Sequence, residues 1–283
     1  MKRIIPCAAA IVLIAFSITR VGLSFGWNGS SVTAPAAARV MMEGEELVYE
    51  VSWYFVKLGT IRTKILKANS NSNTMIRYSA MAYVDSYEGL PFADLHSVSY
   101  TGVDKFLSSR ATRTLEKKGD EWWALNYAYD LPNKRLIIET TWQKDLNSAP
   151  YKSTGVDTLM LQDTTFQDGF SIAYFARSQI GTEQAIRVPT VMYENLGTTT
   201  FWFTNQKSTK TIDALERPIR VVELEGTLDV KGIFGLIGDF KGWFSDDSAA
   251  VPIKAEMNVI LGVVDLELIE WDRDGWNPPI AAE

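Results

Sequence analysis

The sequence predicts an all-β protein, mostly antiparallel, whose large curved sheet is either barrel-like or folded into a sandwich. Three observations support this. Apolar residues recur at every second position after Glu43, as in a half-buried strand, starting with Leu47, Tyr49, Val51, Trp53 and Phe55. Short turn-forming segments separate the successive runs, which favours antiparallel hairpins. Only one segment of the chain follows the period of a helix.

The individual strands are predicted from runs rich in aromatic and β-branched residues. Segments rich in Asn, Ser, Gly, Pro and Asp interrupt them at 69–73, 118–120 and 131–133. The predicted strands occupy residues 46–57, 59–68, 74–84, 95–101, 105–117, 121–130, 134–142, 184–192, 198–206, 219–230, 238–245, 251–260 and 263–271.

One amphipathic helix is predicted around residues 165–179. The segment Thr165–Asp168 is typical of a helix N-terminus, and Phe166, Phe170, Ala173 and Tyr174 then recur at helical spacing until Gly181. Among so many strands, such a helix is expected to pack across a sheet face or to plug an open barrel end.

The N-terminus predicts export. Lys2 and Arg3 precede an uncharged, mostly apolar run over residues 4–18, the layout of a signal peptide. We therefore divide the chain into a signal peptide at 1–26 with an uncertain cleavage site, a flexible linker at 27–42, a single β domain at 43–272 and a loose tail at 273–283. The alternative is an uncleaved N-terminal segment that anchors the protein.

Composition excludes several classes of function. The 283 residues contain one Cys and one His, so a disulfide or a His/Cys zinc site cannot be built within one chain. Asp and Glu (34) outnumber Lys and Arg (28), and no basic stripe is present, which argues against nucleic acid as a partner. No cofactor and no metal are expected.

Four polar residues are candidates for a polar site. Asp94 and His96 would share one face of a strand, but no third metal ligand is identifiable. Asp246 and Asp247 are adjacent and would point to opposite faces unless the strand ends there, and the Ser and Asp residues of 245–248 are typical of a turn. Ser171 within Gly169–Ala173 superficially matches a nucleophile elbow, yet it falls inside the predicted helix. No catalytic residue is assigned.

The glycine-rich segment 231–239 carries the candidate contact residues. Ile233, Phe234, Leu236 and Ile237 would cover a cavity, meet a protein partner or touch lipid if this segment is the tip of a hairpin. The alternative is a loop folded back onto the core.

Four motifs occur in an order that resembles a known family. They are the segment 44–51 followed by Gly59, the helix segment 167–174, the pair 243–247 and 251–253, and the closing strand with 262–264 and Leu268. Together, over about residues 43–271, they resemble the exported bacterial proteins of domain-of-unknown-function family 3108. One departure is the segment 213–218, where family members commonly have a Pro-Ala-Gly turn leading to a cysteine-bearing strand.

The resemblance implies export to a Gram-negative periplasm and a mostly antiparallel β fold, with no established activity and no catalytic residues. The predicted function is that of a non-enzymatic periplasmic envelope protein that binds a lipid or other apolar ligand, or an envelope protein, through its β domain, with peripheral membrane contact as a further option. Two alternatives remain: a carboxylate-based hydrolase using Asp94, His96, Asp246 or Asp247, and an outer-membrane β-barrel.

Overall fold

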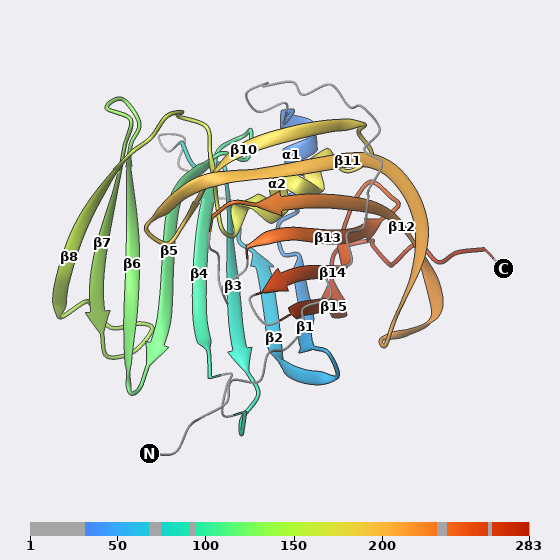
Figure 1. The fold of residues 1–283 in the computed structure, drawn as a ribbon, viewed down its shortest axis with the longest axis horizontal. Coiled ribbons are helices and arrows are strands. Elements are labelled where there is room, and N and C mark those ends of the chain that lie inside the picture. The colour runs from blue at the N-terminus through green and yellow to red at the C-terminus, as the bar shows by residue number, and fades with distance from the viewer. Residues whose placement is uncertain (1–31, 68–74, 91–93, 231–236, 260–261, 283) are drawn as a thin grey trace, which may run out of the picture.

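The structure is a computed structural model that describes residues 32–67, 75–90, 94–230, 237–259 and 262–282. The predicted signal peptide and the contact residues Ile233, Phe234 and Leu236 lie outside the described residues. The described chain forms one sheet of 15 strands that curves around two short helices (Figure 1). The predicted all-β class is confirmed, and the sheet is open and curved.

The first eight strands form a meander in which each strand is antiparallel to the next. They are β1 (Glu46–Trp53), β2 (Val56–Ile65), β3 (Tyr78–Ser86), β4 (His96–Val103), β5 (Ser109–Lys118), β6 (Glu121–Asp130), β7 (Arg135–Gln143) and β8 (Lys152–Met160).

A second series of strands completes the sheet. It comprises β9 (Gln167–Asp168), β10 (Gln184–Met192), β11 (Asn195–Ile212), β12 (Leu215–Leu228), β13 (Gly238–Ser245), β14 (Pro252–Val259) and β15 (Gly262–Asp272). β9 is parallel to β10, and the other pairs are antiparallel. β15 pairs with β1 from Glu46 opposite Asp272 to Trp53 opposite Val264, which joins the two series into one sheet with β8 and β9 at its ends.

The helices differ from the prediction in number and position. α2 (Ser171–Gln179) begins later than expected because Gln167 and Asp168 pair with β10 as a short strand. The linker predicted for 27–42 contains a second helix, α1 (Ala34–Val40), which is capped by the Thr33 hydroxyl. α1 is ordered because Ala37 and Val40 are fully buried in the same core as α2.

The structure differs from the prediction in two further segments. β8 was not expected because its residues are almost all exposed, so no apolar alternation marks it at this end of the sheet. The C-terminal segment is not a loose tail over its described length. Ile280 pairs with the fully buried Ile219, and the Arg220 and Ala281 amides bond the carbonyls of Pro279 and Pro218.

The largest apolar core lies between the two helices and the inner face of the sheet, meaning the face that packs against α2. Phe175 of α2 contacts Phe201 of β11 at 5.9 Å between ring centroids, and Phe201 stacks on Phe203 at 5.6 Å. Full burial of such a ring contributes roughly 1.5–3 kcal/mol. The aromatic contacts therefore fix α2 against one wall of the curved sheet.

Candidate functional site

An apolar cavity of about 340 Å³ lies between α2 and the inner face of the sheet. β1, β2 and β15 contribute Val51, Ile61 and Leu266, and α2 contributes Ile172 and Ala173. The volume falls at the lower end of the range for small-molecule sites, roughly 300–1,000 Å³. An apolar group of that size fits the cavity better than a polar one, because most lining side chains offer no hydrogen bond.

Alternation along the strands explains this lining. Leu47, Tyr49 and Val51 of β1 all line the cavity, in agreement with the predicted apolar face. Phe55 departs from that face: β1 ends at Trp53, and Phe55 lies in the hairpin turn with 94% of its surface exposed. Tyr54 beside it is 67% exposed and has a positive φ of 53°. The two rings form an exposed hairpin tip, and periodicity alone had placed Phe55 on the inward face.

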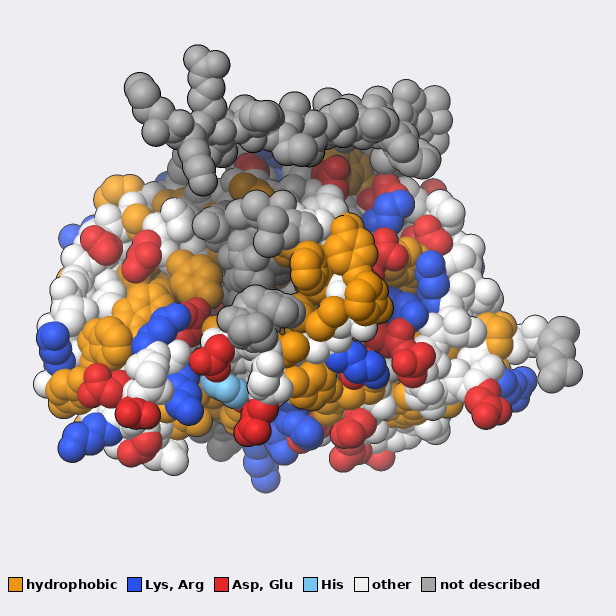
Figure 2. All heavy atoms as spheres, turned by 60° about the horizontal axis from the view of Figure 1, so that its bottom comes forward, with side chains coloured by type: hydrophobic (Ala, Val, Ile, Leu, Met, Phe, Trp, Pro, Cys, Tyr) orange, Lys and Arg blue, Asp and Glu red, His pale blue; other side chains and the backbone are white. Residues whose placement is uncertain are grey.

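Ile237 is the one predicted contact residue within the described chain. Its side chain is 46% exposed, and it lines the cavity together with Gly238 and Phe240 at the start of β13. Figure 2 shows hydrophobic side chains gathered in patches on one face of the molecule, between charged side chains. The contact role of Ile237 stays a prediction.

Asp168 positions the N-terminus of α2. Its Oδ1 accepts hydrogen bonds from the Phe170 and Ser171 amides, both at 2.8 Å. Its Oδ2 accepts from the hydroxyls of Thr101, Ser109 and Thr112 on β4 and β5, at 2.6 to 2.9 Å. The carboxylate is 1% exposed and is satisfied by these five donors, so it ties the helix to the sheet.

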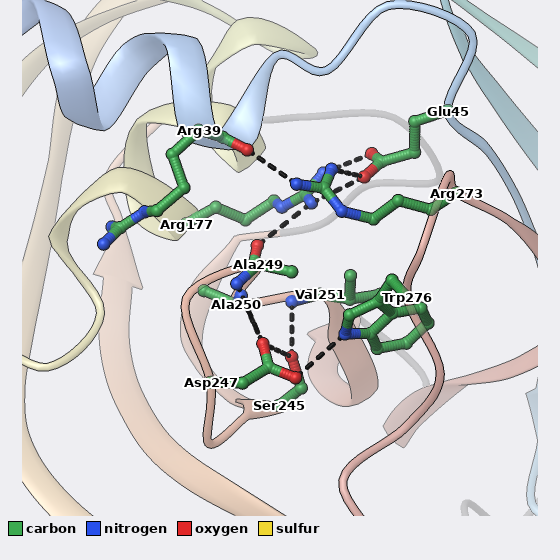
Figure 3. Close-up of polar contacts among 10 residues, drawn as sticks. All are labelled: Arg39, Glu45, Arg177, Ser245, Asp247, Ala249, Ala250, Val251, Arg273 and Trp276. Carbon is green, nitrogen blue, oxygen red and sulfur yellow. Dashed lines mark hydrogen bonds and ion pairs between the residues drawn. The ribbon is translucent and has the colours of Figure 1, made fainter.

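The C-terminal half of α2 is held by a buried ion cluster (Figure 3). Arg177 bonds Glu45 in a bidentate pair at 2.6 and 2.9 Å, and Arg273 bonds the same carboxylate. Arg273 also donates to the Arg39 carbonyl of α1 at 2.7 Å, and Arg177 donates to the Ala249 carbonyl at 3.2 Å. One carboxylate, directly before β1, thus connects the start of that strand with α2 and with the segment after β15.

The electrostatics of this cluster follow from burial and pairing. Burial alone would raise the pKa of Glu45, but the charges and hydrogen bonds of Arg177 and Arg273 outweigh it and hold the pKa below its ordinary value. Burial opposes the charge of Arg177, yet Glu45 raises the pKa of this guanidinium. Burial is the main cause that raises the pKa of the Tyr49 phenol, so Tyr49 remains a neutral hydroxyl at the cavity wall.

The predicted polar residues do not form one site. His96 Nδ1 contacts Asp85 at 2.9 Å, and its Nε2 lies 3.6 Å from Asp94, in an exposed cluster at the β3–β4 connection. Asp246 pairs with Lys207 at 2.9 Å. None of Asp94, His96, Asp246 and Asp247 is among the described residues that line the apolar cavity.

Asp247 stabilises the turn between β13 and β14. Its Oδ1 accepts from the amides of Ala249 and Ala250 and from the Ser245 hydroxyl, at 2.8, 3.2 and 2.9 Å. Its Oδ2 accepts from Trp276 Nε1 at 2.8 Å (Figure 3). Ser171, the other sequence candidate, is fully buried at the first position of α2, where it donates to Gln167 Oε1.

The described residues contain neither a metal-ligand cluster nor a helix able to span a membrane. No three His, Cys, Asp or Glu side chains of the described chain converge in a way that could hold a metal ion. None of the helices in the described part of the chain combines the length and the hydropathy needed to cross a membrane.

Comparison with known proteins supports the fold. No protein-family model and no curated protein matches the chain, so the resemblance to family 3108 is not confirmed. A crystal structure of a β-barrel-like protein of the domain of unknown function DUF1849 from Brucella abortus is similar with a TM-score of 0.50 and 10% identity, over 82% of this chain and 98% of that one.

Two other solved structures match more weakly. The hypothetical protein CT021 from Chlamydia trachomatis matches at a TM-score of 0.33 and 10% identity, over 88% of this chain and 97% of that one. The lipoprotein LppX from Mycobacterium tuberculosis matches at a TM-score of 0.24 and 12% identity, over 87% of this chain and 97% of that one. At these identities the Brucella structure shows a shared β-barrel-like fold, and the other two carry no argument.

Proposed function

We propose that this chain is a non-enzymatic, exported envelope protein that binds an apolar ligand in the cavity between α2 and the inner face of the sheet. The cavity itself carries the proposal: its walls are predominantly apolar, and its volume of about 340 Å³ suits a small ligand. The buried carboxylates at the two ends of α2 support it, since they fix one wall of the cavity.

Export to a periplasm and membership of family 3108 belong to the same proposal. The basic and apolar start of the chain supports export. Three of the quoted motifs contain residues with defined structural roles: Glu45 in the ion cluster, Asp168 at the start of α2 and Asp247 in the β13–β14 turn. Cell fractionation of the full-length chain tests the location, and N-terminal sequencing of the fractionated protein tests cleavage.

A cavity-filling substitution tests ligand binding. Ala173 is exposed on α2 and lines the cavity, so Ala173→Trp places an indole in the ligand volume without replacing a buried side chain. We expect a delipidated sample of the wild type to bind the fluorescent probe 1-N-phenylnaphthylamine saturably, and Ala173→Trp to lose at least about tenfold in affinity.

The matched control is Ala38→Trp, an exposed alanine on α1 outside the cavity lining. It should bind the probe like the wild type. Equal binding by both variants, or no saturable binding by the wild type together with no adduct in native mass spectrometry, would remove the support for this function.

A further inference from the structure

A second, smaller chamber adjoins the apolar cavity. It has a volume of about 100 Å³ and lies between the inner face of β4 to β6 and the segment before α2. Four residues line both spaces: Ser99, Gly169, Phe170 and Met192. Met192 is unbranched and adaptable, and Phe170 sits at the N-cap of α2, so the two spaces adjoin beside the start of the helix.

The chamber differs from the cavity in its chemistry. Hydroxyl-bearing residues from three adjacent strands and from the end of β10 line it, among them Ser99, Thr112, Thr114, Tyr127 and Tyr193. Ser99 and Thr114 are register partners on β4 and β5, and their hydroxyls make no hydrogen bond to another described residue. Two neighbouring hydroxyls are therefore free to bond a ligand.

The charge near the chamber is negative. The Asp168 carboxylate lines it and has no ion pair with a described cation. The buried Glu116 accepts a hydrogen bond from the lining Tyr193 hydroxyl at 2.7 Å and is itself paired with Lys118 at 2.7 Å. No Lys or Arg is among the described residues that line it. Burial first, and then the charges of Asp168, Glu194 and Glu116, raise the pKa of Tyr127. An anionic group would be repelled here.

The larger cavity also lacks a free cation among its described lining residues. Arg177 is paired with Glu45, Lys241 with Glu225 at 2.8 Å and Lys254 with Glu267 at 2.5 Å. An anionic headgroup would compete with the carboxylates of Glu45, Glu225 and Glu267 for these cations. A neutral headgroup needs no cation and therefore does not compete with these carboxylates.

We propose that the ligand is a neutral amphiphile whose alkyl chain occupies the apolar cavity and whose hydroxyl-bearing headgroup occupies the chamber beside Ser99 and Thr114. This inference rests on the proposed function, because it specifies the class of apolar ligand that the same site takes. The headgroup would donate to and accept from the two free hydroxyls and would leave the Asp168 network intact.

Paired probes of equal chain length test the proposal. Isothermal titration calorimetry compares the binding of 1-monolauroylglycerol and of lauric acid to the delipidated protein as it is purified from its exported form. Both titrations are carried out at pH 8, below the critical micelle concentration of each probe. We expect the monoacylglycerol to bind at least about tenfold more tightly than the laurate anion. Equal affinities, or tighter binding of laurate, would overturn the headgroup assignment and leave apolar ligand binding standing. Binding of neither probe would count against the proposed function as well.

Variants of the two free hydroxyls locate the headgroup. The double variant Ser99→Ala and Thr114→Val should weaken monolauroylglycerol binding about tenfold and leave laurate unchanged, since each hydrogen bond contributes a few-fold. Thr114→Ser keeps the hydroxyl and should preserve the selectivity. Thr60→Val changes an outward-facing threonine of β2 in the same way and should have no effect. An unchanged selectivity in the double variant would refute the placement, and if that variant does not fold, the wild-type comparison decides.

Discussion

Glu45→Gln is the substitution that most sharply tests the buried ion cluster. Glu45 is 2% exposed and accepts hydrogen bonds from both Arg177 and Arg273, which are 1% and 7% exposed. A neutral amide keeps the size of the side chain and removes its charge. The change leaves two buried guanidinium groups without a counter-charge at the junction of β1, α2 and the end of β15.

The expected cost follows from this geometry. Breaking a buried ion pair by neutralising one partner costs roughly 3–5 kcal/mol. For a domain of this size, where 1 kcal/mol corresponds to roughly 2–4 °C, the melting temperature should fall by about 6–20 °C. The matched control is Glu225→Gln, whose pair with Lys241 has side chains 39% and 50% exposed. Such a surface pair contributes about 0–1 kcal/mol.

The pH dependence has a defined sign. Because the pKa of Glu45 is lowered in the folded state, the unfolded chain binds the proton more tightly. The stabilisation is therefore complete above the unfolded pKa, near 4.5, and is lost as the pH falls through the lower, folded value. Glu45→Gln should remove this part of the acid sensitivity.

Urea unfolding followed by tryptophan fluorescence measures both effects. The wild type, Glu45→Gln and Glu225→Gln are compared at pH 7 and at intervals down to pH 3. A loss for Glu45→Gln no larger than that for Glu225→Gln, or an identical acid profile in wild type and Glu45→Gln, would refute the reasoning.

Three further predictions concern other parts of the framework. Asp168→Ala should lower the free energy of unfolding by about 3 kcal/mol in urea, because it leaves the α2 amides and three hydroxyls unsatisfied, and a loss under 1 kcal/mol would contradict the network. Gly226→Ala places a methyl group 2.1 Å from Phe240 Cζ and should lower the free energy of unfolding by about 1–3 kcal/mol in the same assay. Gly155→Ala, whose methyl group has no neighbouring atom within 4 Å, should leave the free energy of unfolding unchanged. Equal effects of the two substitutions would contradict the close packing at Gly226. Deleting residues 274–283 removes the Trp276 bond to Asp247 and the Ile280 bridge, so the melting temperature should fall by several degrees, and an unchanged value would restore the loose-tail interpretation.

Local patterns accounted for most of the strands. The alternation in β1 and the short turns of the meander contain the needed information, because side chains in a strand point alternately to two faces and a short turn forces antiparallel pairing. The same logic failed for β8, whose exposed residues show no alternation, and for Phe55, because a run of aromatic residues does not reveal where a strand ends. α1 was missed because its burial depends on α2, which is distant in sequence.

The candidate site was predicted less well than the fold. The sequence singled out Asp94, His96, Asp246 and Asp247, which hold surface pairs and a turn. It named Ile237 as a contact residue for a cavity, a partner or lipid, and the structure places Ile237 in the lining of the apolar cavity, where its contact role stays a prediction. The Ser99 and Thr114 hydroxyls carried no sequence signal, since strand positions occupied by Ser or Thr are common on either face. Their importance follows only from the register that sets them side by side.

The sequence by itself determined the antiparallel β class and the location of one helix, and it excluded a disulfide or a His/Cys zinc site within one chain, because these depend on local period, turn residues and residue counts. The tertiary structure decided where α2 lies and what space it leaves against the sheet. Glu45 meets Arg177 and Arg273 across 132 and 228 residues of chain, and Asp168 meets Thr101 across 67. Such contacts depend on how the curved sheet brings distant segments together, and no local pattern encodes that distance.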